Sequence, residues 1–420
     1  MTDDADSLAA RERRREPRRA TDRGFDPAAR LADREQRDLR RDLQPVDRVA
    51  ARTRVAPDPR GAVPDDGEQQ LLFAANDYLG LASDERVAQA AAEKAHTTGS
   101  GSGASRLLTG DTDAHRALER DIANAKKTER ALVFSSGYAT NVGVLTALEP
   151  DVVFSDELNH ASIVDGCRLS GAETVVYDHA DADALAKAMD RQVDRETDEE
   201  SWLVVTDSVF SMDGDIAPLE GICEEAERYG AWVMVDEAHA TGLYENGEGI
   251  VGHEELTDRV HVQMGTLSKA LASQGGYVAG SEKLIEYLLN AARSFVFSTG
   301  LAPPAVGAAR ESLRITREDD TCRTQLWRNV KRLREGLAGS GFEVWGKTQI
   351  LPVVVGDRTD AETLSDRLRE HGIVAPAIRP PTVPEGTSRL RVAPMATHTE
   401  DEIRHCLDAF EAAGRTTGIL

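Results

Sequence analysis

The stretch WVMVDEAH at residues 232–239 decides the fold class of this chain. Its run of apolar residues, ended by an acid, is typical of a buried strand in a parallel sheet. The turn TLSK at residues 266–269 follows about thirty residues later. Each feature has a plain explanation, because an acid after a strand often caps a helix and a single lysine is usually a solvated side chain. The order of these two features is informative only together with the segments on both sides of them.

Apolar strands alternate with amphipathic helical segments from about residue 112 onward. The predicted strands are residues 131–134, 151–155, 174–177, 202–206 and 232–235. This alternation predicts an α/β fold with a mostly parallel central sheet and helices on both faces. Beyond about residue 305, a helical stretch, the run LPVVVG at 351–356 and a helix starting near Asp360 predict a smaller C-terminal α+β domain.

The N-terminal segment has a different composition. Residues 1–24 have almost no large apolar side chains, which predicts a disordered or weakly helical basic tail. Leucines at near-helical spacing predict a helix over about residues 25–54, and residues 70–75 predict a short strand. We therefore divide the chain into a tail at 1–24, an N-terminal arm at 25–75, a large domain at 76–305 and a small domain at 306–420.

The composition argues against several classes of function. The chain has 420 residues, of which 73 are acidic and 50 basic, and its formal net charge of -23 argues against general binding to nucleic acid or anionic membranes. No apolar run reaches the roughly 20 residues that cross a bilayer, and the N-terminus is charged rather than a signal peptide. We expect a cytoplasmic protein with no membrane partner and no nucleic-acid partner.

Two local features bear on possible partners. The first 60 residues carry 16 basic and 13 acidic residues, and a basic arm could bind nucleic acid, but the alternating charges favour a solvated tail. The four cysteines lie far apart without metal-ligand spacing, so we expect buried, reduced thiols and no metal site. They are Cys167, Cys223, Cys322 and Cys406.

Polar side chains cluster where the predicted strands end. These clusters are residues 135–138, 156–160, 207–214 and 236–239. In open parallel sheets, ligands bind at the carboxyl ends of the strands. The sequence therefore predicts a ligand site at this edge of the sheet.

The chemistry of these clusters points to pyridoxal phosphate (PLP). Asp236, at a strand end, can keep a pyridine nitrogen protonated, and Lys269 can form a Schiff base with an aldehyde. The segment SGYATN at residues 136–141 lies between a strand and a helix that we expect to begin near Thr140. Backbone N–H groups and the helix dipole at such a turn favour a phosphate, although a tight turn needs glycine for its geometry alone.

Two histidines could contact the same cofactor. His239 lies one helical turn after Asp236 and could reach the cofactor's phenolic oxygen. His160 could stack on the ring, although a lone histidine after a strand is more often a structural residue. The hydroxyl groups of Thr266 and Ser268, beside the lysine, could donate hydrogen bonds to the phosphate. They could equally have only a structural role in the turn and in helix capping.

With these motifs in place, the chain resembles the α-oxoamine synthases, a family of fold-type I PLP enzymes. The resemblance runs from about Phe25 to the C-terminus. Its matching segments, in order, are NDYLGL at 76–81, GSGASR at 101–106, VFSMDGD at 209–215, DEAHATG at 236–242, TLSKA at 266–270 and FST at 297–299. The resemblance implies an acyltransferase that condenses an amino acid with the acyl group of an acyl-CoA. It also implies PLP as cofactor and an active site shared across a homodimer.

The resemblance also implies roles for individual residues. Lys269 would be the Schiff-base lysine and general base, Asp236 would pair with the ring nitrogen, and His160 would stack on the ring. Ser211 and His239 would lie near the ring oxygen. The residues expected around the phosphate are Ser136, Gly137, Tyr138 and Thr266, together with Ser298 and Thr299, which would reach the phosphate of the other subunit.

Residues 377–391, AIRPPTVPEGTSRLR, are similar to the biotin-pathway branch of this family, whose members condense L-alanine with pimeloyl-CoA. This similarity implies that Arg391 binds the amino-acid carboxylate with help from Asn76, since an arginine fork suits that bidentate role. Arg389 is close enough in sequence to exchange roles with Arg391. An ion pair with a nearby acid is the simpler expectation for Arg389.

Two alternatives remain open. A related branch of the family uses glycine and acetyl-CoA, and a catalytically silent relative could act as a subunit or scaffold. The presence of Lys269, Asp236 and His160 together argues against the silent relative. Ala272 stands where many members of the family have glycine, and Ala104, in the loop at 101–105, is a second departure. Each could change loop flexibility near the site.

Overall fold

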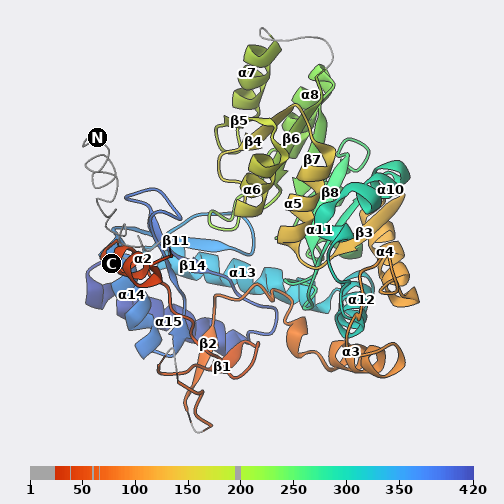
Figure 1. Cartoon of the computed structure of the whole chain (residues 1–420). Coiled ribbons are helices and arrows are strands. Elements are labelled where there is room, and N and C mark those ends of the chain that lie inside the picture. The colour runs from red at the N-terminus through yellow and green to blue at the C-terminus, as the bar shows by residue number, and fades with distance from the viewer. Residues whose placement is uncertain (1–23, 38, 59–60, 66, 194–199) are drawn as a thin grey trace, which may run out of the picture. The chain divides into compact units, whose positions relative to one another are not determined.

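The structure is a computed structural model, and it describes residues 24–37, 39–58, 61–65, 67–193 and 200–420 (Figure 1). The chain divides into two compact units, one of residues 1–45 with 56–63 and one of residues 46–55 with 64–420. The predicted basic tail lies outside the described residues, apart from its last residue. All of the predicted site residues belong to the second unit.

In the described part of the first unit, helix α2 spans Pro27–Gln36, and Asp26 caps its first turn. The helix predicted over residues 25–54 is therefore wrong beyond the end of α2. Pro45 disfavours a helical conformation in the residue before it, so a regular helix does not continue past that point. Residues 52–54 instead form strand β1, which belongs to the second unit.

A seven-stranded sheet forms the centre of the second unit, in the order β3-β9-β8-β7-β6-β4-β5 (Figure 1). All neighbouring pairs among β4, β5, β6, β7 and β8 are parallel, whereas β9 is antiparallel to its neighbours β3 and β8. The five strands predicted between residues 131 and 235 are confirmed to within one residue at each end. The strands are β3 Arg130–Phe134, β4 Val152–Asp156, β5 Glu173–Tyr177, β6 Trp202–Asp207, β7 Trp232–Asp236, β8 Val262–Thr266 and β9 Gly276–Gly280.

Strands β8 and β9 were not predicted, because their sequences VQMGT and GYVAG contain glycines, which have low strand propensity. Tertiary contacts fix them instead. Gly276 of β9 lies opposite Phe134 of β3 on one side and Thr266 of β8 on the other. A Cβ atom on Gly276 would lie 2.7 Å from the backbone nitrogen of Gly137. Glycine is therefore required where β9 passes the loop that follows β3.

Helices cover both faces of this sheet, as the sequence predicts. On one face α5, α6, α10 and α11 pack against Val205, Met234 and Met264. On the other face α7 and α8 pack against Val204 and Val233, while α4 and α12 cover β3 and β9. Because successive strand residues point to opposite faces, burial of both faces gives the continuous apolar runs of the sequence.

The longer helices of the second unit have the following bounds in chain order: α3 Glu85–Thr97, α4 Asp113–Lys126, α5 Gly137–Leu148, α6 Ala161–Ser170, α7 Ala182–Val193, α8 Leu219–Tyr229, α10 Glu282–Ala291, α12 Pro303–Glu318, α13 Thr321–Gly339, α14 Arg358–Glu370 and α15 Glu400–Thr417. Shorter helical turns are η1 Leu81–Ser83, η2 Glu245–Gly247, α9 Ile250–His253 and α11 Arg293–Val296.

The C-terminal part forms a smaller α+β region, as predicted, and its strands belong to two sheets. One is the antiparallel sheet β10-β11-β14-β13, and the other is β1-β2-β12, in which the N-terminal strand β2 pairs in parallel with β12. The strands are β1 Arg52–Arg54, β2 Gln69–Leu72, β10 Glu343–Val344, β11 Leu351–Gly356, β12 Ile373–Val374, β13 Ala377–Ile378 and β14 Ser388–Val392. The four-part division of the chain stays a prediction, and α12 runs unbroken across its proposed boundary at 305/306.

Two expectations from composition can be compared with the described residues. No helix among them is long and apolar enough to cross a bilayer. The cysteines are free thiols, and Cys167, Cys223 and Cys406 are buried, whereas Cys322 is partly exposed. The expectation of buried, reduced thiols therefore holds for three of the four.

A buried ion pair ties the end of α4 to the residue that follows β7. Lys126 Nζ lies 2.6 Å from Glu237 Oε2, and the two side chains are 3% and 0% exposed. The other carboxylate oxygen of Glu237 accepts a hydrogen bond from the backbone N–H of Val251 at 2.9 Å. Glu237 directly follows Asp236, so this pair helps to hold the strand end on which the site is built.

Lys126→Met is expected to lower the free energy of unfolding by about 3–5 kcal/mol, because it leaves the Glu237 carboxylate buried without its counter-charge. The measurement is urea unfolding of the full chain. The double variant Lys126→Met/Glu237→Gln removes both charges, so it should recover at least half of that loss. A single variant as stable as the parent would show that the pair does not hold this part of the fold.

Candidate active site

A cavity of about 220 Å³ lies at the carboxyl edge of the large sheet, where the sequence predicts polar clusters to meet. Its walls come from the segments that follow β3, β4, β6, β7 and β8. Nine of the eleven predicted cofactor-binding residues line it, the exceptions being Ser298 and Thr299. The lining residues are Ser136, Gly137, Tyr138, Asn141, His160, Ser162, Asp207, Ser211, Asp236, Ala238, His239, Met264, Thr266, Ser268 and Lys269.

The predicted phosphate end of the cavity is the start of α5. This helix begins at Gly137, three residues before the predicted start, because the Ser136 side chain caps it by accepting a hydrogen bond from the N–H of Ala139 at 3.0 Å. A Cβ atom on Gly137 would lie 3.2 Å from Met264 and 3.5 Å from Thr266. The loop therefore approaches β8 so closely that backbone atoms, rather than a side chain, face the cavity here.

Hydroxyl groups flank this helix start. The Thr266 hydroxyl lies 2.7 Å from that of Ser268 and donates a hydrogen bond to the carbonyl of Gly275 at 2.9 Å. The Tyr138 side chain is about half exposed, and its hydroxyl donates to Asp165 on α6. Thr266 and Ser268 thus line the cavity, whereas the Tyr138 hydroxyl is hydrogen-bonded to the Asp165 carboxylate.

Asp236 lines the cavity and is 2% exposed. One carboxylate oxygen accepts the N–H of Ala238 at 2.8 Å, and the other accepts the side-chain amide of Asn141 at 2.8 Å. The same Asn141 nitrogen donates to the Ser162 hydroxyl at 2.8 Å. Among the described residues, the amide oxygen of Asn141 is buried without a hydrogen-bond partner. Asn141, which sequence reasoning missed, therefore orients the carboxylate.

His160 caps helix α6, which follows β4. Its Nδ1 accepts the backbone N–H of Ser162 at 3.2 Å, and its own backbone N–H donates to Asp207 at 2.8 Å. Burial lowers the pKa of His160, against the opposing effect of the Asp236 carboxylate. The imidazole is therefore neutral at physiological pH, which suits a ring that packs against another ring.

Asp207 is a second buried carboxyl group at the same edge. Sequence reasoning placed it in a polar cluster without assigning it a role. It ends β6 and lies opposite Asp236 of β7 in the sheet register. Burial raises the pKa of Asp207 well above its usual range, and the Asp236 charge adds to this effect. The two neighbouring acids also have different hydrogen-bond partners, since Asp207 accepts the backbone N–H of His160 and Asp236 accepts the side-chain amide of Asn141.

Lys269 lies in the loop between β8 and β9, with Nζ 2.7 Å from His239 Nε2. Burial lowers the pKa of Lys269 to about 8, although Asp236 and Asp207 favour the charged form. Burial also lowers the pKa of His239 well below its usual range, so this ring is neutral. An amine with a pKa near neutrality can both accept and return a proton.

The residues predicted to bind the carboxylate of the amino acid come together beside this lysine. Arg391 of β14 is buried, its Nε donates to the carbonyl of Ser211 at 2.6 Å, and one terminal nitrogen donates to Asn76 Oδ1 at 3.0 Å. The Tyr78 hydroxyl lies 2.7 Å from His239 Nδ1. Sequence reasoning missed Tyr78, although it lies within the quoted segment NDYLGL.

Arg389 does not join this group. It forms an ion pair with Asp213 at 2.6 Å, donates to the carbonyl of Thr387 at 2.9 Å, and its guanidinium lies 4.8 Å from the centre of the Trp345 ring. The ion pair expected from the sequence is therefore present. Its Asp213 partner and the neighbouring ring hold Arg389 in a structural position.

Ser298 and Thr299 lie outside the cavity of a single chain, in a loop joined to the segment that carries the GSGASR motif. Thr299 forms an isolated bridge with Ser105, and the N–H of Gly300 donates to the carbonyl of Ala104 at 3.0 Å. Their predicted contact with the other subunit stays a prediction. Ala272, which stands where many members of the family have glycine, has φ of 48°, a left-handed conformation that glycine adopts more easily.

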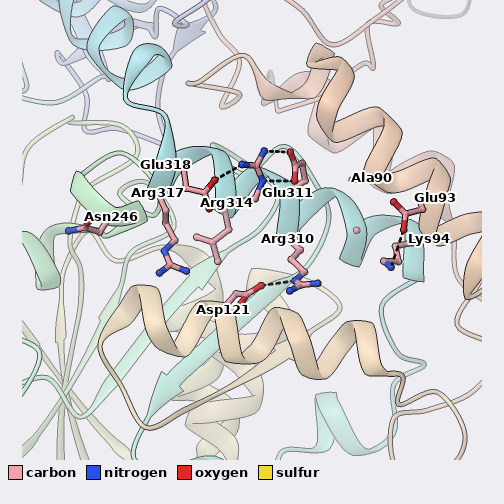
Figure 2. Close-up of a pocket in the computed structure, with 12 residues that line it drawn as sticks. Ala90, Glu93, Lys94, Asp121, Asn246, Arg310, Glu311, Arg314, Arg317 and Glu318 are labelled. Carbon is pink, nitrogen blue, oxygen red and sulfur yellow. Dashed lines mark hydrogen bonds and ion pairs between the residues drawn. The ribbon is translucent and has the colours of Figure 1, made fainter.

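A larger cavity of about 560 Å³ lies elsewhere, between α3, α4 and α12 (Figure 2). Its charges largely pair with one another: Arg310 with Asp121 at 2.6 Å, and Arg314 with Glu311 at 2.7 Å. None of the predicted site residues lines it. The predicted cofactor-binding residues instead gather at the smaller cavity at the strand ends.

A protein-family model also matches the chain and identifies its family. The model described as "Aminotransferase class I and II" matches residues 68–410. The chain therefore belongs to the class I and II aminotransferase family, and its fold is that of the fold-type I PLP enzymes. The acid at a strand end, the amine in the following loop and the helix start that faces the cavity fit PLP, which is the cofactor of this protein.

Among named relatives, the chain is 46% identical over 358 residues to the 8-amino-7-oxononanoate synthase of Lysinibacillus sphaericus, an alignment that covers 84% of this chain and 91% of the relative. Solved structures of a serine palmitoyltransferase (SPT) with PLP are also similar. One has a TM-score of 0.85 and 31% identity, and covers 94% of this chain and 98% of the other. The 8-amino-7-oxononanoate synthase of Francisella tularensis has a TM-score of 0.67 and 26% identity, and covers 83% and 98%.

Proposed function

We propose that this protein is a PLP-dependent acyltransferase that condenses L-alanine with pimeloyl-CoA to give 8-amino-7-oxononanoate, CoA and CO₂, a step of biotin biosynthesis. The observation that carries the proposal is that Lys269 and Asp236 line one cavity and that Arg391 is hydrogen-bonded to Ser211 in its wall. The chain is also 46% identical to 8-amino-7-oxononanoate synthases over most of its length.

When bound, PLP supplies an electron sink that draws electrons from the Cα atom of the amino acid. Asp236 would hold the ring nitrogen in its protonated form, because its buried carboxylate already accepts two hydrogen bonds that keep it in place. His160, as a neutral ring at the N-terminus of α6, would pack on the ring face. Ser136, Gly137, Tyr138 and Thr266 would surround the phosphate.

Lys269 and Arg391 would handle the amino acid. The lowered pKa of Lys269, due to burial, leaves an amine that can remove the proton from Cα near neutral pH and later return one. The Arg391 guanidinium would bind the carboxylate, with Asn76 and Ser211 already holding it in position. Arg389 has its own acid partner and is left out of this proposal.

The proposal includes a homodimer. The bridge between Thr299 and Ser105 places two loops together, and large apolar side chains on these loops are exposed: Phe297 at 72% and Leu108 at 78%. A second copy of the chain would cover them and would bring Ser298 and Thr299 to the other subunit's phosphate. The proposal also places the reaction in the cytoplasm, where acyl-CoA substrates are available, and keeps a PLP-binding domain at 76–305 with a small domain at 306–420.

The substrate test is an incubation of the purified protein and PLP with each amino acid and thioester pair, with the product identified by mass spectrometry. The pairs are L-alanine with pimeloyl-CoA, glycine with acetyl-CoA, and L-serine with palmitoyl-CoA, the last because of the structural similarity to serine palmitoyltransferase. We expect 8-amino-7-oxononanoate from the first pair. Product from glycine and acetyl-CoA alone would favour the alternative branch of the family, and no product from any pair would favour a silent relative.

A further inference from the structure

A continuous chain of hydrogen-bonding groups leads away from Lys269 into the protein. Nζ lies 2.7 Å from His239 Nε2, and His239 Nδ1 lies 2.7 Å from the Tyr78 hydroxyl. That hydroxyl lies 3.0 Å from Asn76 Oδ1, and Arg391 donates to Tyr78 at 3.3 Å and to Asn76 at 3.0 Å. Tyr78 is 0% exposed and His239 is 6% exposed, so water does not replace these partners.

The position of one proton in this chain depends on the charge of Lys269. Arg391 can only donate, so its contact uses a lone pair of the Tyr78 oxygen. In a first arrangement, Tyr78 donates its hydrogen to Asn76, and His239 donates from Nδ1 to the Tyr78 oxygen. Nε2 of the neutral histidine then has a free lone pair, and it accepts a hydrogen bond from the Lys269 ammonium.

A second arrangement uses the same atoms at the same distances. Tyr78 turns its hydrogen toward His239 Nδ1, and the histidine proton then sits on Nε2. This N–H donates to the nitrogen of Lys269, which must be an uncharged amine to accept it. The two arrangements therefore match the two protonation states of the lysine, and neither leaves a buried nitrogen of the histidine without a partner.

We propose that Tyr78 is a positioning residue that, through His239, lets Lys269 gain and lose a proton without losing its hydrogen bond. The inference rests on the proposed function, in which the lysine takes up and returns a proton. Tyr78 itself does not need to touch substrate or cofactor for this role. Its hydroxyl acts by selecting which nitrogen of the histidine carries the proton.

Other charged groups face the same lysine, and they limit what the proton chain can do. The Asp236 and Asp207 carboxyl groups favour the ammonium form, while Arg391 on β14 opposes it. His160, from the start of α6, acts on the His239 ring in the same direction as Lys269. Because these groups stay in place when Tyr78 is changed, a change in the pKa of the lysine reports on the hydroxyl.

Tyr78→Phe is expected to lower the pKa of Lys269. Without the tyrosine oxygen, the nearest charge facing His239 Nδ1 is the Arg391 guanidinium. This cation favours a lone pair on Nδ1, so the proton of the neutral histidine lies on Nε2. An Nε2–H group opposes an ammonium beside it. We expect a decrease of about one pH unit, the equivalent of one buried hydrogen bond.

The measurement is the pH dependence of acetylation of Lys269 in the full chain freed of PLP. Trace acetic anhydride would be added between about pH 6 and about pH 10, since only the free amine reacts, and the modified peptide would be quantified by mass spectrometry. Lys331, whose side chain is 74% exposed, provides an internal reference in every sample. Its midpoint should be the same in all variants.

Tyr277→Phe is the matched control. Tyr277 is also 0% exposed, and its hydroxyl lies 2.7 Å from Thr241 rather than from the histidine. This control should leave the midpoint of Lys269 unchanged. An unchanged or raised midpoint in Tyr78→Phe would overturn the proposal and leave Tyr78 as a packing residue.

Asn76→Ala tests the same chain without touching a fully buried ring. Loss of the Asn76 oxygen removes the acceptor of the first arrangement, so the Tyr78 hydrogen turns to His239 and the midpoint of Lys269 should fall again. An unchanged acetylation midpoint of Lys269 in Asn76→Ala would contradict the two proposed hydrogen-bond arrangements. Because acetylation needs neither substrate nor PLP, a failed proposal for Tyr78 is distinguishable from a wrong assignment of the substrates, which the product analysis tests.

Discussion

Lys269→Ala is expected to abolish multiple turnover while the chain keeps its fold. The side chain supplies both the amine that bonds the cofactor and the base that moves the Cα proton, and general-base catalysis alone is worth about 10²–10⁴-fold. We therefore expect turnover to fall by at least about 10³-fold. The measurement is product formation from L-alanine and pimeloyl-CoA, with far-ultraviolet circular dichroism as the test of folding.

Two controls separate loss of the amine from loss of structure. Lys331→Ala removes an exposed lysine of α13 and should leave turnover unchanged. A small primary amine added to Lys269→Ala should restore part of the rate, because it can enter the space left by the side chain and act as base. Multiple-turnover product from Lys269→Ala at the parent rate would contradict the assigned role.

The same substitution should change how stability depends on pH. In the folded chain without PLP, burial lowers the pKa of Lys269 to about 8, whereas the unfolded value is about 10.4. Between these values the unfolded chain binds more protons, so the parent gains stability as pH rises from about 8 to about 10.4. Lys269→Ala should lack this gain, which urea unfolding at the two ends of that range would measure.

The sequence predicts those parts of the site that depend on short segments. Asp236 ends an apolar strand and Lys269 stands in a small-residue turn, so local pattern is enough to identify both. Ser136 and Gly137 are likewise identified by the strand-to-helix turn that contains them. Burial and register then bring these segments to one edge of the sheet, as expected for an α/β fold.

The residues that were missed act over long separations. Tyr78 meets a histidine 161 positions later, and Asn141 meets a carboxylate 95 positions later. No local period or spacing reports such contacts, because they depend on which helix packs on which strand. The overestimated N-terminal helix is the opposite case: leucine spacing alone favoured a helix that Pro45 and the pairing of β1 with β2 prevent from continuing.

Asp236→Asn is expected to reduce turnover by about 10²–10³-fold without unfolding the chain, comparable to the loss of one group that stabilises developing charge in a buried site. An amide cannot balance a protonated ring nitrogen, so the cofactor would draw electrons from Cα less strongly. The new amide would also face the Asn141 amide nitrogen, which now donates to the carboxylate at 2.8 Å. Affinity for PLP should therefore fall together with the rate.

Asp207→Asn provides the comparison that makes this prediction specific. Asp207 lies opposite Asp236 in the sheet, but burial raises the pKa of Asp207 well above the usual range, which favours its neutral form, so an amide is a closer substitute there. The rate loss should therefore be smaller in Asp207→Asn than in Asp236→Asn. PLP affinity, measured by equilibrium dialysis, should follow the same order. Equal losses in the two variants would contradict a specific requirement of the cofactor for the Asp236 carboxylate.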